Sequence, residues 1–351
     1  MLNNKTILIT GGTGSFGKKM AQIVLAQFEP KKLIIFSRDE LKQFEMSQKY
    51  SLKKHPCIRY MLGDIRDKER LYQAFSGVDY VIHAAALKQV PAAEYNPEEF
   101  IKTNVLGGMN VIDACLYNNV KKVIALSTDK ACNPINLYGA TKLCSDKLFT
   151  AANVYAGSDK DTRFAVVRYG NVLGSRGSVI PFFKECAQKT GVLPITDLNM
   201  TRFWITLDQA VHFVLASLNK MKGGEIFVPR IPSMKIMDLA KAIDPKCKQE
   251  IVGIRPGEKV HEILLSEDEA RNAAQYSECF IVQPNHQVKQ GLSEFMRLGK
   301  VNGQGCPEGF SYTSNNNTEW LKISDLRQLV ENISDDYSIE DSRWSMEDVP
   351  E

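Results

Sequence analysis

Residues 6–17 read TILITGGTGSFG and carry the clearest structural signal in the sequence. They start with an apolar, β-branched run typical of a buried strand, and Gly11, Gly14 and Gly17 follow. Such glycines allow a tight turn, a close approach of the backbone to a pyrophosphate, and tight packing of the next helix, whose free N–H groups attract anions. Because the loop lies between an expected strand and an expected helix, it predicts dinucleotide binding.

Further strands and helices alternate after this loop. Apolar runs rich in Ile and Val recur at 6–10, 33–36, 58–63, 79–82, 122–127 and 163–169. Helical patterns lie between them, at 15–28, 39–53, 67–75, 92–118 and 137–155. Near-continuously apolar strands that alternate with helices are typical of a parallel sheet covered on both faces. The sequence therefore predicts an α/β fold with a doubly wound parallel sheet, the Rossmann arrangement.

The character of the chain changes after the last of these strands. The elements become shorter, Pro and Gly are more frequent, and two clear helices are expected at 206–221 and 235–243. We expect an NADP-binding Rossmann domain at 1–175 and a smaller α+β substrate-binding lobe at 176–330, whose chain crosses back to the sheet. The tail at 331–351 carries eight acidic residues against one arginine, which indicates a solvated or peripheral segment.

Composition excludes several classes of function. The 351 residues carry a net charge of only +3, without a basic cluster interleaved with aromatic residues, so a nucleic-acid partner is not expected. A leader pattern and an apolar run of the ~18 residues that span a membrane are both missing, which favours the cytoplasm and no membrane partner. The eight cysteines form no CxxC pair and the five histidines are dispersed, so we expect a reducing compartment and no metal site.

The end of the second strand indicates the cofactor. Ser37 and Arg38 stand where an acidic residue would hold the ribose 2′-hydroxyl of NAD. A guanidinium there would bind a 2′-phosphate, which favours NADP. A solvated Arg38, beside a helix that begins at Asp39 and Glu40, is the alternative. Asp64, after the third strand, is placed either to accept from the adenine amino group or to cap a helix.

Two ionisable pairs follow the fifth strand in LSTDKACNPINLYGATKL, residues 126–143. In the second pair, Tyr138 and Lys142 lie one helical turn apart and share a face directed at the cofactor crevice. The charges of Lys142 and of an oxidised nicotinamide are expected to lower the pKa of Tyr138 from ~10 toward neutrality. Tyr138 would then take a hydroxyl proton while hydride leaves for NADP.

These motifs, with HAAALK (83–88), Asn104 in KTNV and the strand-end Thr128, resemble the extended short-chain dehydrogenase/reductase family, whose members act on nucleotide sugars. The resemblance covers roughly residues 5–270. It implies that Thr128 hydrogen-bonds the reacting hydroxyl and that Lys142 also contacts the nicotinamide ribose. The residues expected to bind the cofactor are Gly11, Thr13, Gly14, Ser15, Phe16, Gly17, Ser37, Arg38, Asp64, Ile65, Ala84, Ala85, Tyr138 and Lys142.

The first ionisable pair, Asp129 and Lys130, distinguishes among the reactions of that family. A 4-epimerase needs only the Tyr and the Lys, together with rotation of the sugar. Once C4 is oxidised, however, the C5 proton is acidic, and a base near C5 with an acid near O6 can expel water before hydride returns to C6. Four further stretches resemble the inverting 4,6-dehydratases of the family, at 168–183, 194–206, 223–235 and 252–262.

That resemblance implies a lyase that removes water from UDP-N-acetylglucosamine with inversion at C5. By the same resemblance, the product would be UDP-2-acetamido-2,6-dideoxy-β-L-arabino-hexos-4-ulose, and the reaction would open the synthesis of pseudaminic acid, which decorates flagellin. Asp129 would protonate O6 and Lys130 would remove the C5 proton, where retaining dehydratases carry Asp-Glu. Lys130 can act as a base only if its pKa is depressed, which we expect from a cationic nicotinamide or partial burial. A mere ion pair in a turn is the alternative.

A UDP-sugar carries two phosphates, and arginine suits phosphate through its planar set of donors. The residues expected to bind the substrate are Lys88, Asn171, Arg202, Arg255 and Glu258. Salt bridges between the lobes are the alternative for each of them. By resemblance alone we expect a homo-oligomer, with a hexamer as one arrangement.

Two other functions stay open at the level of sequence. One is a UDP-sugar 4-epimerase, or a 4,6-dehydratase with another substrate or with retention at C5. The other is a non-catalytic NADP-binding scaffold that kept the fold. The intact set of Thr128, Tyr138 and Lys142 argues against the scaffold.

Overall fold

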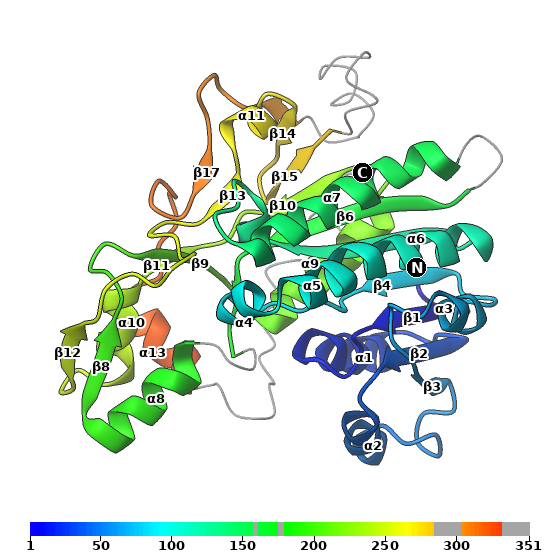
Figure 1. Cartoon of the computed structure of the whole chain (residues 1–351), viewed down its shortest axis with the longest axis horizontal. Coiled ribbons are helices and arrows are strands. Elements are labelled where there is room, and N and C mark those ends of the chain that lie inside the picture. Colours follow the sequence, from blue (N-terminus) through cyan, green and yellow to red (C-terminus); the bar gives the residue numbers. More distant parts are fainter. Residues whose placement is uncertain (157–160, 175–178, 284–302, 332–351) are drawn as a thin grey trace.

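The largest sheet has ten strands in the order β16-β14-β15-β10-β6-β5-β4-β1-β2-β3. The computed structural model describes residues 1–156, 161–174, 179–283 and 303–331 (Figure 1). The seven parallel strands are β1 (Thr6–Thr10), β2 (Lys32–Ser37), β3 (Ile58–Leu62), β4 (Tyr80–His83), β5 (Lys122–Thr128), β6 (Arg163–Tyr169) and β10 (Ile226–Pro229). The antiparallel edge consists of β15 (Cys279–Val282), β14 (Ala273–Gln275) and β16 (Gln304–Gly305).

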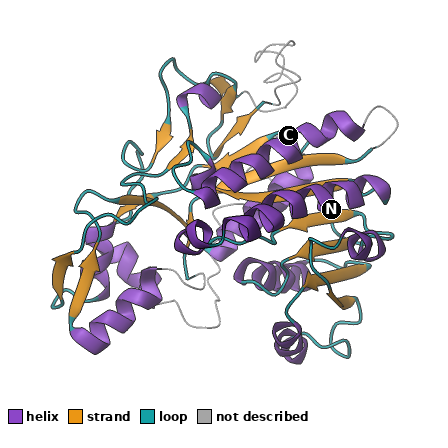
Figure 2. Ribbon diagram, viewed as in Figure 1, coloured by secondary structure: helices purple, strands orange, loops and turns teal. Residues whose placement is uncertain are grey.

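Helices cover both faces of this sheet (Figure 2). On one face, α6 lies between α3 and α7; on the other, α1 packs against α9. The bounds are α1 (Ser15–Gln27), α2 (Glu40–Lys49), α3 (Lys68–Ala74), α6 (Gly107–Tyr117), α7 (Leu137–Ala156) and α9 (Leu207–Lys220). The central strands β1 and β5 are buried along almost their whole length, because both of their faces are covered. The predicted doubly wound α/β fold is confirmed.

The helix expected at 92–118 is interrupted. It is divided into α4 (Val90–Tyr95), α5 (Pro97–Phe100), the π-helical segment η1 (Ile101–Leu106) and α6. Pro97 lacks an N–H and cannot continue α4. Within η1, the Asn104 amide accepts from the N–H of Leu87 at 2.8 Å and donates to its carbonyl at 2.9 Å. The interruption therefore fixes the loop after β4, which lines the cavity described below.

The second lobe has its own apolar cluster, formed by α8, β8, β9, α10 and α13 (lower left in Figure 1). The bounds of its elements are β7 (Asn171–Val172), α8 (Val179–Thr190), β8 (Val192–Ile195), β9 (Thr201–Ile205), β11 (Ser233–Lys235), α10 (Ile236–Ile243), β12 (Lys248–Ile251) and α13 (Ile323–Glu331). Near the end of β5 lie η2 (Asp129–Ala131), β13 (Ile263–Leu265), α11 (Glu267–Ala270) and β17 (Tyr312–Thr313).

The helices expected at 206–221 and 235–243 are α9 and α10, whereas α8 was not expected. Since α9 packs on α1 and β10 joins the sheet, the chain returns to the first layer after residue 175. The division of the chain into two domains at this point remains a prediction. The acidic tail from 332 onward lies outside the described residues.

Candidate active site

The glycine loop between β1 and α1 presents backbone to a large cavity. Gly11 has a φ of +65°, and a Cβ there would lie 2.8 Å from the backbone nitrogen of Ala85. A Cβ at Gly17 would lie 2.5 Å from backbone atoms of Gly12. Helix α1 begins directly after Gly14, whose N–H donates to the carbonyl of Gly11 at 2.9 Å. The loop thus leaves room for an anion at the N-terminus of α1.

Two cations lie at the carboxyl end of β2. The Arg38 side chain is 55% exposed, and its Nη1 lies 3.7 Å from Oδ2 of Asp64. The neighbouring acid, Asp39, caps α2 by accepting from the N–H of Lys42 at 3.0 Å, and it also pairs with Lys42 Nζ. Arg38 and Lys42 both line the cavity. Because Lys42 and the N-terminus of α2 neutralise the charge of Asp39, the part of the cavity at the end of β2 is suited to an anion.

Asp64 is not a helix cap. The N-cap of α3 is Asp67, which accepts from the N–H of Arg70 at 3.0 Å. Asp64 instead binds Arg66, whose Nη2 lies 2.8 Å from Oδ2. Burial would raise the pKa of Asp64, but Arg66 and Arg38 outweigh it and hold the pKa below its ordinary value. The helix-cap alternative is therefore wrong, and the adenine contact remains a proposal.

Tyr138 and Lys142 lie in the first turns of α7 and are 8% and 4% exposed. Lys142 Nζ donates to the carbonyl of Leu126, on β5, at 2.7 Å. Burial raises the pKa of Tyr138 to about 12, although Lys130 and the Thr128 hydroxyl act to lower it. With the protein's own groups alone, the cost of burying a phenolate outweighs the nearby cation, so the lowering expected once an oxidised nicotinamide adds its charge stays a prediction.

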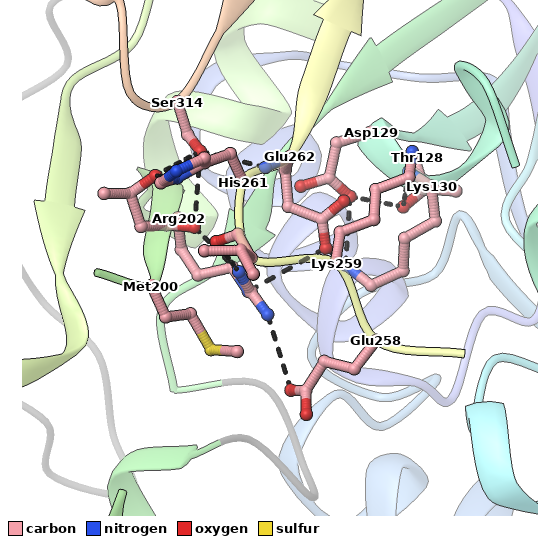
Figure 3. Close-up of polar contacts among 12 residues, drawn as sticks. Thr128, Asp129, Lys130, Met200, Arg202, Glu258, Lys259, His261, Glu262 and Ser314 are labelled. Carbon is pink, nitrogen blue, oxygen red and sulfur yellow. Dashed lines mark hydrogen bonds and ion pairs between the residues drawn. The ribbon is translucent and has the colours of Figure 1, made fainter. Parts of the chain in front are cut away.

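Asp129 and Lys130 lie in the short turn η2 directly after β5, and Figure 3 shows their side chains beside that of Thr128. Asp129 is 1% exposed, and its Oδ1 accepts from Thr128 Oγ1 at 3.0 Å and from Lys130 Nζ at 3.1 Å. Burial raises the pKa of Asp129; Lys130 opposes that rise and Glu262 adds to it. A carboxyl group that tends to hold its proton is suited to act as an acid.

Lys130 contacts two carboxylates. Its Nζ lies 3.1 Å from Oδ1 of Asp129 and 2.9 Å from Oε1 of Glu262. Burial would lower the pKa of Lys130, but the two carboxylates outweigh burial and raise the pKa above its ordinary value. The predicted depression is therefore wrong for this structure. The ion pair considered as the alternative is present, and both of its members line the cavity.

The arginines predicted to bind the substrate share one carboxylate, that of Glu258. Arg202 Nη2 donates to Oε1 at 3.4 Å, and Arg255 donates through Nε and Nη2 at 3.0 and 2.9 Å. All three residues lie in the expected second lobe, so these ion pairs are not the salt bridges between the lobes considered as the alternative, and all three side chains also line the cavity. Asn171 lines it as well, and within the described part of the chain its buried Oδ1 accepts no hydrogen bond.

Two charged residues of this site, Glu262 and Lys259, were not predicted from the sequence. Glu262 is 1% exposed, and its Oε1 lies 3.8 Å from Nε of Arg202 as well as close to Lys130. Lys259 Nζ donates to the carbonyl of Cys132 at 2.6 Å. Both lie in the quoted stretch 252–262, but no local pattern indicates that they meet η2, which is distant in sequence.

One cavity of about 1370 Å³ brings every predicted site residue together. Lys88 lies in it too, and burial, with the nearby charge of Lys130, lowers the pKa of Lys88. The predicted residues on its wall are Gly11, Thr13, Gly14, Ser15, Phe16, Gly17, Ser37, Arg38, Asp64, Ile65, Ala84, Ala85, Lys88, Thr128, Asp129, Lys130, Tyr138, Lys142, Asn171, Arg202, Arg255 and Glu258. Their individual roles remain proposals.

No group of three or more His, Cys, Asp or Glu side chains in the described part of the chain is arranged to hold a metal ion. None of its helices is both long and apolar enough to cross a membrane.

Comparison with known proteins places the chain in a family. Residues 7–284 match the family described as "Polysaccharide biosynthesis protein". A Campylobacter jejuni protein named "UDP-N-acetylglucosamine 4,6-dehydratase (inverting)" is 56% identical over 94% of this chain and 98% of its own length. A Rickettsia conorii protein named "UDP-glucose 4-epimerase" is 39% identical over 94% of this chain and 96% of its own.

Solved structures agree on the fold. The structure described as Pen from Bacillus thuringiensis has a TM-score of 0.84 at 37% identity and covers 94% of this chain and 99% of its own. DesIV from Streptomyces venezuelae, a dTDP-glucose 4,6-dehydratase, has a TM-score of 0.66 at 19% identity and covers 93% of this chain and 96% of its own. The chain therefore belongs to the polysaccharide biosynthesis protein family, with the fold of the extended short-chain dehydrogenases/reductases.

Proposed function

We propose that the protein is an inverting UDP-N-acetylglucosamine 4,6-dehydratase. It would remove water from the sugar, invert C5 and release UDP-2-acetamido-2,6-dideoxy-β-L-arabino-hexos-4-ulose. The observation that carries the proposal is the placement of Asp129 and Lys130 beside Tyr138 on one cavity wall. The 56% identity to the C. jejuni dehydratase supports the same reaction.

The cavity fits a nicotinamide dinucleotide, because the glycine loop leaves space above the N-terminus of α1. When bound, this cofactor would accept a hydride from C4 of the sugar and return it to C6. Tyr138 would take the proton of the C4 hydroxyl, and Thr128 would orient that hydroxyl. Lys142, held on the carbonyl of Leu126, would contact the nicotinamide ribose.

Asp129 and Lys130 would act on the ketone. Lys130 first passes a proton to a carboxylate in contact with its Nζ, and the neutral amine then takes the C5 proton. The carboxyl of Asp129 gives its proton to O6 as the C6–O bond breaks, so that water leaves and a C5–C6 double bond forms. Each proton has a donor and an acceptor within this cluster.

NADP is our proposal for the cofactor. Arg38 and Lys42 line the cavity at the end of β2, and Asp39 is occupied with capping α2, so a 2′-phosphate would meet cations there. The more distant DesIV structure is described as containing NAD, and its 19% identity supports the fold alone. Asp64 would accept a hydrogen bond from the adenine amino group.

The setting of the enzyme is proposed from the family resemblance. We expect it to act in the cytoplasm as a homo-oligomer, with a hexamer as one arrangement. Its product would enter the synthesis of pseudaminic acid for flagellin glycosylation. The substrate's diphosphate would be held by Arg202 and Arg255, with Glu258, Asn171 and Lys88 contacting the rest of the nucleotide sugar.

The second candidate is a UDP-sugar 4-epimerase, because the Rickettsia relatives carry that name. Incubation of the protein with UDP-N-acetylglucosamine and NADP in deuterated water, followed by NMR and mass spectrometry, separates the two. The dehydratase predicts loss of one water, a C6 methyl group and deuterium at an inverted C5. A product of unchanged mass that is epimeric at C4 would instead support the epimerase.

A further inference from the structure

Glu262 shares the ammonium group of Lys130 with Asp129. Lys130 Nζ lies 2.9 Å from Oε1 of Glu262 and 3.1 Å from Oδ1 of Asp129, so two carboxylates compete for one ammonium group (Figure 3). Asp129 and Glu262 are each 1% exposed. Two buried carboxylates so close to one cation cannot both be charged without a large cost, and one of them tends to keep its proton.

Glu262 is the better paired of the two carboxylates. Its Oε1 also lies 3.8 Å from Nε of Arg202, and the charge of Lys259 stabilises its ionised form. Burial would raise the pKa of Glu262, but Lys130 and Arg202 outweigh burial and lower it. Asp129, in contrast, has Lys130 as its cationic partner in the described chain, and its pKa is raised by burial.

Hydrogen bonds fix the backbone of Glu262. Its N–H donates to Oγ of Ser314 at 2.9 Å, and the N–H of Ser314 donates to its carbonyl at 2.8 Å. The Thr201 hydroxyl contacts Ser314 Oγ at 2.6 Å and Nδ1 of His261 at 2.8 Å. Figure 3 shows His261 and Ser314 on the far side of Glu262 from Lys130. The carboxylate is therefore held in place before any ligand arrives.

One oxygen of each carboxylate has no hydrogen-bond partner among the described residues: Oδ2 of Asp129 and Oε2 of Glu262. Both residues line the cavity. An unpaired oxygen on a buried carboxyl group is poorly tolerated when it is charged, but it can carry the proton that the reaction needs.

We propose that Glu262 is the counter-ion of Lys130, and that its charge keeps Asp129 neutral, so that Asp129 can give a proton to the leaving hydroxyl. This inference rests on the proposed dehydration. Glu262 is a positioning residue, since it acts through Asp129 and Lys130. With Glu262 as the counter-ion, Asp129 and Lys130 do not form an isolated ion pair in which both the acid and the base are charged.

The same arrangement allows Lys130 to lose a proton and become a base. An N–H bond of Lys130 breaks as an O–H bond to Oε1 of Glu262 forms, which leaves a neutral amine. That amine takes the C5 proton, while Asp129 gives its own proton to O6 and water leaves. At the end of the elimination, Glu262 is protonated, Lys130 is an ammonium and Asp129 is a carboxylate, so no proton is lost or gained.

Glu262→Gln tests the inference, because it removes the charge and keeps the shape. The protein is labelled with ¹³C at the Asp carboxyl carbons, the Asp129 signal is assigned with Asp129→Asn, and its titration is followed by NMR. We expect the pKa of Asp129 to fall by about one to three units in the variant, with the dehydration rate about 100-fold lower. Exchange of hydride with C4 is expected to continue, since Tyr138 and Lys142 are unchanged.

The other ionisable groups around the pair stay the same in this comparison. They are Lys88, Tyr138, Arg202 and Lys259. Glu262→Asp keeps the charge and is expected to keep a raised pKa at Asp129. Glu250→Gln, on the exposed strand β12, is the matched control and is expected to change neither value.

Three results would overturn the inference. Asp129 could titrate at the same pH in Glu262→Gln as in the wild type, or Glu262→Asp could lower its pKa as far as Glu262→Gln does. If Glu262→Gln fails to fold, the titration of Asp129 in the wild type still tests the inference. An Asp129 pKa at or below the ordinary value of about 3.9 would contradict it. If the wild type does not dehydrate UDP-N-acetylglucosamine, the proposed function fails, whereas the Asp129 titration still tests the role of Glu262.

Discussion

The two ends of the cavity are built in different ways. At the cofactor end, the wall is the backbone of consecutive residues, Gly11–Gly17, where added Cβ atoms would collide with the neighbouring chain. At the reaction end, the wall is side-chain charge from segments far apart in sequence: Lys130 on η2, Arg202 on β9 and Glu262 before β13. The cofactor end therefore depends on the shape of the backbone, and the reaction end depends on how protons are distributed among charged side chains.

This difference indicates how each end should respond to change. A substitution at the cofactor end should alter stability or cofactor affinity with little effect on the pH dependence. A substitution at the reaction end should leave the cofactor bound and alter proton transfer. Substitutions at each end can therefore separate the two kinds of effect.

Tyr138→Phe should lower the dehydration rate by about 10³-fold, because the proton acceptor for the C4 hydroxyl is lost. The ring still fills its buried position, so the cofactor dissociation constant should change little. Steady-state turnover and a cofactor titration measure the two effects. Tyr155→Phe, also on α7 but 69% exposed, is the control and should be silent. A loss of less than tenfold in Tyr138→Phe would remove the tyrosine from the proposed chemistry.

A second cluster of buried charges surrounds Arg168, close to η2 and the reaction end. Arg168 is fully buried, with Nη1 at 2.8 Å from Oε2 of Glu269 and Nη2 at 3.1 Å from Oδ2 of Asp146. Glu269 also accepts from Sγ of Cys132, close to η2, at 3.4 Å. Burial would raise the pKa of Glu269, but Arg168 outweighs it and lowers the pKa to about 2.

A folded-state pKa below the ordinary 4.5 means that Glu269 stabilises the protein above pH 4.5 and loses this effect as the pH falls toward 2. The stabilisation amounts to about 3 kcal/mol. In denaturant unfolding, Glu269→Gln should therefore be less stable than the wild type at pH 7, and the difference should shrink on acidification. Glu267→Gln, exposed on the same helix, is the control. A difference that does not depend on pH would contradict this account.

Gly17→Ala should lower the free energy of unfolding by about 1–3 kcal/mol and weaken cofactor binding, because its Cβ would meet the backbone of Gly12 at 2.5 Å. Gly108→Ala is the matched control, since a Cβ there lies 3.5 Å from its nearest neighbour, a side-chain atom of Phe149. Denaturant midpoints and cofactor titrations of both variants measure the difference. Equal stability of the two variants would show that the loop adapts more than its geometry indicates.

Arg38→Ala should weaken NADP about tenfold and leave NAD almost unchanged, because only NADP carries the 2′-phosphate. Fluorescence titrations of the variant and the wild type with both cofactors measure this selectivity. An equal effect on both cofactors would exclude a role for Arg38 at the 2′-phosphate.

Much of the fold and part of the site could be predicted from sequence. The strands at 6–10 and 163–169, the glycine loop and the turn between Tyr138 and Lys142 depend on local periodicity and spacing, which a sequence shows directly. The interruption of the expected helix 92–118 was not predicted. It is accompanied by hydrogen bonds between the Asn104 amide and the Leu87 backbone, which form only in the folded chain.

The charges of the site were predicted less well, for a physical reason. The pKa of Lys130 was expected to be depressed, but Asp129, its neighbour in sequence, and Glu262, from a distant segment, raise it. Burial raises the pKa of Tyr138, and the predicted fall depends on the added charge of an oxidised nicotinamide. Motif spacing identifies which residues meet a cofactor, whereas a protonation state depends on burial and on every neighbouring charge.

Lys130→Ala gives the most direct test of the central claim, that one cavity first oxidises the sugar and then removes water through Asp129 and Lys130. The variant is incubated with NADP and UDP-N-acetylglucosamine deuterated at C4, in ordinary water. We predict that deuterium reaches the bound cofactor while no water is lost and C5 does not exchange with solvent. Water loss at the wild-type rate in this variant would contradict the account.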